Sequence, residues 1–282
     1  RMPGRLPLML LLMSQATSPT GTQAPPAGAP RPETQRAFET YVRLTESRLD
    51  GLLQLQDGFY WANTPQRRSR LRQAGVVCAP QNGRGDIRVP RGLIHDWVGA
   101  AFVPGATVGQ VLALLQDYDN HRNTYKPEVI DSRTLKRSGN DFTVRLRLLK
   151  RKVNVTAVLD AYSEVHYRPL AGHDWQSRSH STRVVEIENP GGPRERERTR
   201  RQDHGYLWRL NTYWLFRERD GGVYVECEAV SLSRSVPAAL AWLIDPIIRS
   251  LPRDELLGTL RTTRALALKS IAGGGPASGP QK

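Results

Sequence analysis

The residues best suited to chemistry are a histidine and an aspartate that are adjacent in the sequence, His95 and Asp96. A histidine that contacts a carboxylate can act as a general base. Residues 92–105 (GLIHDWVGAAFVPG) are bounded by glycines and predict a strand, in which neighbouring side chains point to opposite faces. We therefore predict that His95 and Asp96 do not pair, that His95 and Trp97 share a face, and that His95 is a hydrogen-bonded histidine at a strand edge.

Sequence motifs for catalysis or metal binding are absent from the rest of the chain. The other histidines are scattered, and no HExxH, CxxC or paired-histidine spacing occurs, so we predict no metal site. The GxSxG nucleophile motif, the P-loop and the dinucleotide-binding fingerprint are missing as well. The sequence thus identifies no catalytic residue and no cofactor.

Two cysteines, Cys78 and Cys227, leave two alternatives open. They could form one disulfide in an exported protein, or they could be separate buried thiols. Cys227 lies on the apolar side of a strand pattern, which is typical of a small core residue.

Alternating apolar and polar residues predict the elements that must position these groups. Alternation of this kind indicates an antiparallel sheet with one buried face. A helix with Val108, Val111, Leu112 and Leu115 on one side is predicted over residues 106–117. The predicted strands cover residues 92–105, 130–136, 141–150, 153–167, 174–187, 205–219 and 223–231.

A long apolar stripe near the C-terminus, over residues 236–269, predicts a helix that must lie on an apolar surface. We expect it to face Trp208, Trp214 and Phe216. Pro246 and Pro252 each remove a backbone donor, so we expect them to break the helix into two pieces that could open as a gate.

The N-terminal part predicts export and a helical extension. Residues 6–13 (LPLMLLLM) follow two arginines and precede small residues, a pattern typical of a signal peptide for a periplasmic or secreted protein. Residues 17–33 are rich in Pro, Gly, Ala, Ser and Thr and indicate a linker. Residues 34–55 have helical periodicity.

The chain is basic, with 41 Lys and Arg against 27 Asp and Glu and a net charge of +14. This charge permits nucleic acid, anionic lipid or acidic partners. No nucleic-acid-binding motif is present, so we predict no nucleic-acid partner. The run RERERTRR, residues 194–201, is typical of a solvated loop, and contact with an anionic membrane surface is its alternative interpretation.

The order of these elements resembles the START-like or SRPBCC superfamily, the helix-grip fold of Bet v 1, polyketide cyclases and coenzyme Q-binding proteins. Two segments carry the resemblance: FVPGATVGQVLALLQDYDNHRNTYKPEV, residues 102–129, and SLSRSVPAALAWLIDPIIRSLPRDELLGTLRTTRAL, residues 231–266. The resemblance covers about residues 89–270. It implies an α+β fold in which a curved antiparallel sheet of about six to seven strands surrounds the C-terminal helix, after an N-terminal helical extension.

This resemblance divides the chain into four parts. The parts are a signal peptide and the start of a linker (1–24), linker plus helical extension (25–88), a START-like domain (89–272) and a frayed tail (273–282).

The resemblance also implies a cavity between sheet and helix that binds, or transports, a hydrophobic small molecule or lipid. Two alternatives stay open: a cyclase- or hydrolase-type enzyme that uses the same cavity, with His95 as the first residue to mutate, and an interaction module with a solid core. The candidate cavity residues are His95, Trp97, Phe102, Phe142, Val144, Ala157, Leu159, Ser179, Trp208, Leu210, Trp214, Val225, Cys227, Leu240, Leu243, Ile244 and Ile247.

Overall fold

The structure, a computed structural model, describes residues 28–55, 58–152, 155–235 and 238–273. Its helices are α1 (Pro32–Leu53), α2 (Pro65–Ala74), α3 (Val108–Gln116), the 3-10 helix η1 (Tyr118–Asn120), α4 (His121–Thr124) and α5 (Ala238–Ala272). Its strands are β1 (Val76–Pro80), β2 (Asp86–Val89), β3 (Gly92–Pro104), β4 (Val129–Ser138), β5 (Asp141–Lys152), β6 (Val155–Pro169), β7 (Trp175–Glu188), β8 (Arg196–Glu197), β9 (Arg209–Arg219) and β10 (Gly222–Arg234).

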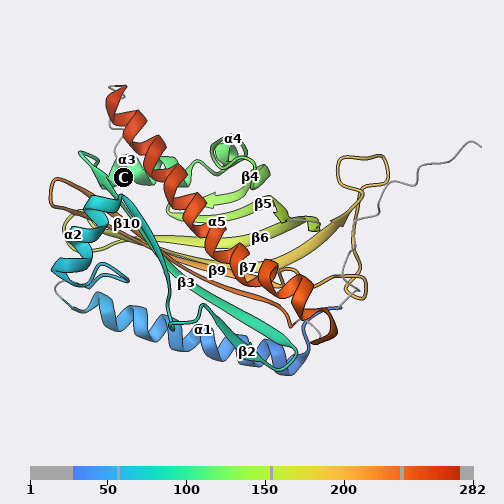
Figure 1. Cartoon of the computed structure of the whole chain (residues 1–282). Coiled ribbons are helices and arrows are strands. Elements are labelled where there is room, and N and C mark those ends of the chain that lie inside the picture. The colour runs from blue at the N-terminus through green and yellow to red at the C-terminus, as the bar shows by residue number, and fades with distance from the viewer. Residues whose placement is uncertain (1–27, 56–57, 153–154, 236–237, 274–282) are drawn as a thin grey trace, which may run out of the picture.

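These ten strands form one antiparallel sheet in the order β1-β3-β10-β9-β7-β6-β5-β4, and β2 and β8 pair with β3 and β7. The helix-grip class expected from the sequence is confirmed, with α5 lying across one face of the sheet (Figure 1). The sheet has more strands than expected, because the sequence pattern did not reveal the short strands β1, β2 and β8. Since β1 and β2 pair with β3, the predicted boundary at residue 89 crosses the sheet.

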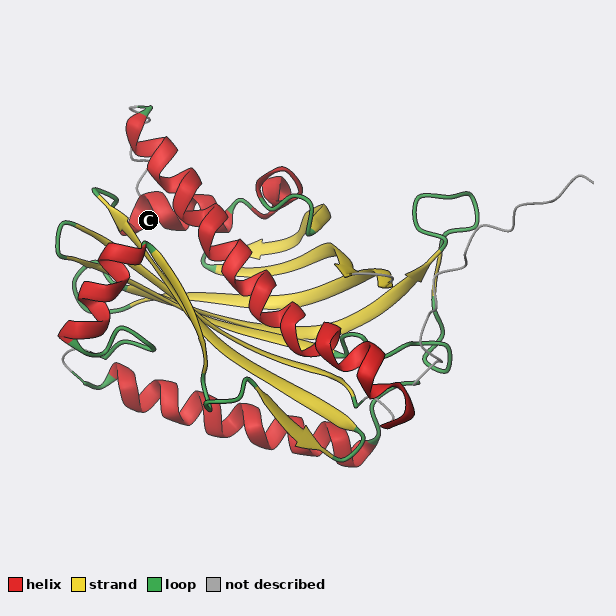
Figure 2. Ribbon diagram, in the orientation of Figure 1, coloured by secondary structure: helices red, strands yellow, loops and turns green. Residues whose placement is uncertain are grey.

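The expectation of a single buried face is wrong for β3, β9 and β10. Nearly every residue of β3 and β10 is buried, whichever face it occupies. One face packs under α5, where Leu256 and Leu260 join the core with Val103 and Phe216. The other face is covered by α1 and by residues 58–62, which place Phe38, Leu49 and Phe59 among other side chains of the same strands. Figure 2 shows the two long helices on either side of the sheet.

Polar contacts fix α1 to the sheet in addition to this apolar packing. The Tyr41 hydroxyl donates to Asp96 Oδ2 at 2.6 Å, and Arg48 forms an ion pair with Glu228. The Tyr213 hydroxyl donates to Glu46 Oε1 at 3.0 Å. Asp96 and Glu228 are completely buried, so their partners on α1 belong to the folded core.

The C-terminal helix is continuous across both prolines, so the predicted break is wrong. A proline removes one helical hydrogen bond, but packing along the helix can offset this loss. Gly99 permits that packing, because a Cβ at this position would lie 2.4 Å from Leu260 Cδ1. Arg264 Nε also donates to the Phe102 carbonyl at 2.8 Å, which ties the helix to β3.

Residues 58–75, between α1 and β1, pack against the rest of the fold. Phe59, Tyr60 and Trp61 are buried, and the basic run that follows forms α2, capped by the Thr64 side chain. Arg67 and Arg68 lie over the rings of Trp61 and Phe59, with 5.3 and 5.4 Å to the ring centroids. Arg67 and Arg68 therefore cover aromatic side chains of the preceding segment.

Some predictions fall outside the described residues. These are the signal peptide, most of the linker and all but the first residue of the tail. The described residues contain no helix long and apolar enough to cross a membrane.

Candidate ligand cavity

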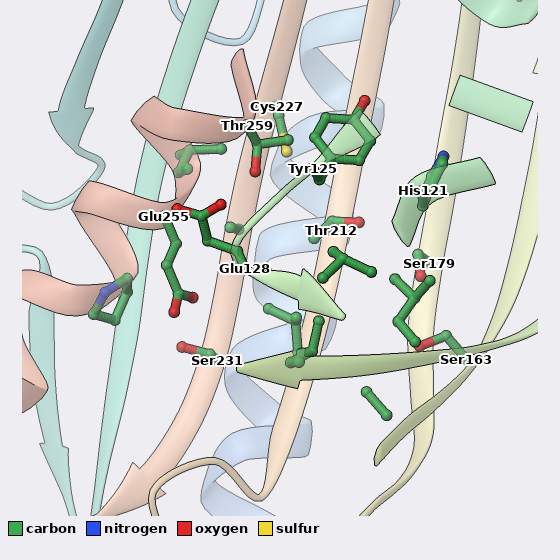
Figure 3. A pocket seen from close by; sticks show the side chains of 18 of the residues that line it. His121, Tyr125, Glu128, Ser163, Ser179, Thr212, Cys227, Ser231, Glu255 and Thr259 are labelled. Atoms are coloured by element: carbon green, nitrogen blue, oxygen red, sulfur yellow. The ribbon is translucent and has the colours of Figure 1, made fainter. Parts of the chain in front are cut away.

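A cavity of about 270 Å³ lies between the sheet and α5. Its walls come from the α5-facing sides of β3, β5, β6, β7, β9 and β10, from the region of α3 to α4, and from residues 251–262 in the middle of α5. Most lining side chains are apolar, including Leu115, Val144, Leu148, Leu210, Trp214 and Leu256. Figure 3 shows the cavity from close by.

Six of the predicted candidates line this cavity: His95, Val144, Ser179, Leu210, Trp214 and Cys227. Trp97, Phe142, Leu159 and Val225 pack within the hydrophobic core on the same side of the sheet but do not line the cavity. Ala157 is buried in β6 away from it. Leu240, Leu243, Ile244 and Ile247 have side chains outside the described part of the structure.

Phe102 and Trp208 lie on the wrong face for a cavity residue. Both belong to the cluster under α1. Phe102 is an even-numbered position of β3, where the odd-numbered residues His95, Ala101 and Val103 face α5. Trp208 precedes β9, which begins at Arg209, so the alternation of that strand does not extend to it. The C-terminal helix therefore faces Trp214 and Phe216 but not Trp208.

His95 and Asp96 point to opposite faces, as predicted. His95 lines the cavity and is buried, and its Nε2 lies 3.0 Å from Ser233 Oγ. Asp96 lies under α1. The two side chains cannot act as a histidine–carboxylate pair.

Sequence reasoning missed a group of aromatic polar residues at the α3–α4 end of the cavity. Tyr118 and Tyr167 both line it, and their hydroxyl oxygens are 2.9 Å apart. His121 Nε2 lies 3.1 Å from the Leu115 carbonyl, and burial lowers the pKa of His121 to about 4. The imidazole is therefore neutral at pH 7 and donates to that carbonyl. Tyr125 also lines the cavity, with its hydroxyl 3.0 Å from Thr263 Oγ1.

A sequence signal for Tyr167 existed. It continues the alternation of β6 that places Ala161 and Val165 on the α5-facing side. Tyr118 gives no such signal, because it lies in a 3-10 turn whose direction follows from tertiary packing.

Small hydroxyl side chains from several neighbouring strands line the cavity. Ser179 and Thr212 are cross-strand partners on β7 and β9, and Ser231 is the partner of His95 on β10 and β3. Ser163 on β6 also lines the cavity, on the same side of the view as Ser179 and His121 (Figure 3). Because these side chains are short, they leave space that larger residues would fill.

Charged side chains lie where the cavity is exposed to solvent. Lys150 of β5 forms an ion pair with Glu255 of α5, and both are only partly buried. Glu128, the other carboxylate lining the cavity, is exposed. The Lys150–Glu255 pair connects the sheet to the helix across this rim.

The two cysteines are free thiols in the structure. Burial raises the pKa of Cys227 and raises that of Cys78 to about 11, so both stay protonated at neutral pH. Among the described residues, no group of three or more His, Cys, Asp or Glu side chains could hold a metal ion.

The basic run at residues 194–201 forms β8 and exposed turns, as expected for a solvated segment. Several of its charged side chains form ion pairs with other residues of the same chain: Arg196 with Glu188, Arg198 with Glu186, and Glu197 with Arg183.

The strand order, the long C-terminal helix across the sheet and the cavity beneath it define a helix-grip fold, the fold that the sequence resemblance implied. No protein-family model and no curated protein matches the chain.

Several solved structures are similar to this chain. The STAR-related lipid transfer protein of Xanthomonas axonopodis is 16% identical, with a TM-score of 0.44, and the alignment covers 68% of this chain and 98% of that one. The Zhui aromatase/cyclase of Streptomyces sp. R1128 is 11% identical, with a TM-score of 0.44 and 65% and 99% covered. Human STARD10 is 10% identical, with a TM-score of 0.42 and 74% and 83% covered. At these identities none of the three assigns a ligand to this chain.

Proposed function

We propose that this protein binds a hydrophobic small molecule in the cavity between the sheet and α5. The observation that carries the proposal is a cavity of about 270 Å³ with a mostly apolar lining and a charged rim. Apolar cavities with a few polar groups are the usual binding sites for small molecules. A solid core, as the interaction-module alternative requires, does not agree with this cavity.

The volume limits the size of the ligand. An apolar cavity of roughly 150 Å³ binds benzene, and pockets for drug-sized ligands begin at roughly 300 Å³. The cavity described above lies between these values, so it suits a compact molecule of about two fused rings better than a lipid with two acyl chains. Transport would add release at a target site to the same binding step.

The proposal is tested by filling the cavity from the helix. Gly258 lies on α5 and lines the cavity, and nothing lies within 4 Å of a Cβ built at this position. In Gly258→Leu the new side chain enters this space, and the loss of a helical glycine stabilises α5 by about 1 kcal/mol. We expect unchanged or higher stability in thermal unfolding, together with at least about tenfold weaker binding of a hydrophobic probe such as 2-naphthol, equivalent to about 1.4 kcal/mol.

Gly51→Leu is the matched control. Gly51 is an exposed glycine of α1 with nothing within 4 Å of its Cβ position, far from the cavity lining. It should keep wild-type binding in titration calorimetry. Native mass spectrometry of protein purified under mild conditions adds a second measurement, since bound small molecules should be lost in Gly258→Leu and kept in Gly51→Leu. Equal binding by both variants would contradict the proposal.

We propose export and contact with an anionic membrane surface as further properties of the chain. Export is supported by the apolar run at residues 6–13, and it is tested by N-terminal sequencing of protein recovered outside the cytoplasm.

The membrane proposal is supported by the exposed Arg194, Arg200 and Arg201. Co-sedimentation with vesicles of anionic phospholipid tests the membrane proposal, by comparing the wild-type protein with a variant in which these three arginines are replaced.

A further inference from the structure

Two buried tyrosine hydroxyls meet at the α3–α4 end of the cavity. Tyr118 of η1 and Tyr167 of β6 are nearly inaccessible to solvent, and their oxygens are 2.9 Å apart. The Phe142 ring packs against both, with centroid distances of 5.2 and 5.8 Å, and the His121 ring lies 4.8 Å from that of Tyr118. This aromatic packing fixes the positions of both hydroxyl groups.

A third hydroxyl belongs to the same cluster. Ser177 on β7 is the cross-strand partner of Tyr167, is 1% exposed and lines the cavity. Its hydroxyl interacts with that of Tyr167 and lowers the Tyr167 pKa, although the contact falls outside strict hydrogen-bond geometry. Tyr118, Tyr167 and Ser177 therefore form one cluster of hydroxyl groups at the cavity wall.

The protons of the cluster show what it can recognise. Three hydroxyl groups carry three protons, and the contacts of Tyr167 with Tyr118 and with Ser177 use two of them. Within the described chain, at least one proton and several oxygen lone pairs remain for a ligand. An oxygen atom of a phenol or a ketone is matched to such a cluster, because a hydroxyl can donate to it and, in a phenol, accept from it.

The surroundings of the cluster favour a neutral ligand. Burial raises the pKa of both Tyr118 and Tyr167, so both stay protonated at physiological pH, and the neighbouring His121 is neutral. Among the Asp, Glu, Lys and Arg side chains that line the cavity in the described chain, Glu128 is exposed, and the partly buried Lys150 and Glu255 pair with each other. A carboxylate placed at the cluster would be desolvated without a compensating positive charge.

We propose that the hydroxyl cluster of Tyr118, Tyr167 and Ser177 anchors the neutral oxygen of a compact cyclic phenol or ketone. This inference rests on the proposed function and names the class of ligand. The apolar remainder of the ligand would extend along Val144, Leu210 and Trp214, and its oxygen would be the atom that fixes its orientation.

Three fused-ring compounds of matched size test the inference: naphthalene, 2-naphthol and 2-naphthoate. We expect the full-length protein at pH 7 to bind 2-naphthol about tenfold more tightly than naphthalene, the usual range for one added hydrogen bond in a buried site. We expect 2-naphthoate to bind most weakly. Titration calorimetry or ligand fluorescence measures all three affinities.

Variants separate the anchor from the cavity. Tyr167→Phe should remove the advantage of 2-naphthol and leave the affinity for naphthalene unchanged. Ser177→Ala should reduce this advantage without altering the aromatic packing, and it serves as the second variant if Tyr167→Phe unfolds. Tyr162→Phe is the control, because Tyr162 lies on β6 but packs in a cluster that does not line the cavity.

The outcomes are distinguishable. Equal affinity for naphthalene and 2-naphthol, tightest binding of 2-naphthoate, or an unchanged preference in both Tyr167→Phe and Ser177→Ala would overturn the anchor while the cavity keeps its proposed function. Failure of the wild-type protein to bind any of the three compounds would overturn both proposals.

Discussion

Replacement of Glu226 by leucine is expected to lower the free energy of unfolding by about 3–5 kcal/mol, because three buried backbone donors lose their acceptor. Glu226 lies on β10 and is completely buried. Its carboxylate accepts hydrogen bonds from the backbone N–H groups of Tyr60, Trp61 and Ala62 at 2.6, 3.0 and 2.7 Å. Leucine would leave these three donors buried without an acceptor, and each such group costs about 1–3 kcal/mol.

Glu226→Gln is the control for shape, since it keeps one acceptor oxygen and nearly the same volume. We expect a smaller loss of stability than in Glu226→Leu, measured by chemical denaturation. Limited proteolysis should show cleavage near residues 55–64 earlier in Glu226→Leu than in the wild type. A change below about 1 kcal/mol in Glu226→Leu would mean that the hydrogen bonds to residues 60–62 contribute little to the fold.

Stability is expected to fall as the pH rises from about 7 to 9, above the ordinary pKa of histidine, because buried carboxyl groups with raised pKa values lie under α1. Burial is the main cause that raises the pKa of Asp96 to about 6 and that of Glu228 to about 8, and the neighbouring Asp96 contributes to the shift of Glu228. Tyr41 and Arg48 of α1 face them and favour their charged forms, but burial is the largest effect. The folded state therefore binds more protons than the unfolded state above the ordinary carboxyl pKa of about 4.

The sign of the effect follows from this difference in protons. The contribution of Asp96 and Glu228 to stability is greatest below the ordinary carboxyl pKa and is lost as the pH passes through the raised values, by a total on the order of 3 kcal/mol. Urea unfolding at several pH values measures it. Glu228→Gln, which cannot ionise, should flatten the dependence, whereas Glu46→Gln should not, since hydrogen bonding with His180 lowers the pKa of Glu46. Stability that rises with pH in the wild type would refute this assignment.

The apolar alternation of single strands predicted the α5-facing side of the sheet correctly. Val144 and Leu148 of β5, and Leu210 and Trp214 of β9, lie on the side that their spacing indicated. The helix over residues 106–117 is confirmed as α3, with a capping box formed by Thr107 and Gln110. These features depend on residues close together in the sequence, so local periodicity is sufficient to predict them.

The second core under α1 could not be predicted in the same way. Asp96, Glu226 and Glu228 are acidic, and acidic residues opposite an apolar face ordinarily indicate solvent. Their partners, Tyr41, Arg48 and the backbone of residues 60–62, precede them by 55 to 180 positions. Only the tertiary fold shows that these carboxylates are hydrogen-bonded inside the protein.

The candidate cavity was predicted in part for a related reason. His95, Ser179 and Cys227 were found because they lie on regular strands. Tyr118 and His121 lie in short helices whose side-chain directions are set by packing against Phe142 and Tyr125. A short turn carries no periodic signal, so the polar end of the cavity became visible only in three dimensions.

The unequal cover of the sheet has a mechanical consequence. β3 and β10 are enclosed on both faces, whereas β4 is largely exposed and β5 alternates between buried and half-buried residues. Segments with fewer buried contacts open at a lower free-energy cost. Backbone amides of β3 and β10 should therefore exchange with deuterium last, and those of β4 and β5 first. The cavity wall formed by β3 and β10 is therefore expected to be rigid, and the wall on the β4–β5 side is expected to be flexible. The flexible wall, which carries the ion pair from Lys150 to Glu255, is the one we expect to adjust its shape to an entering molecule.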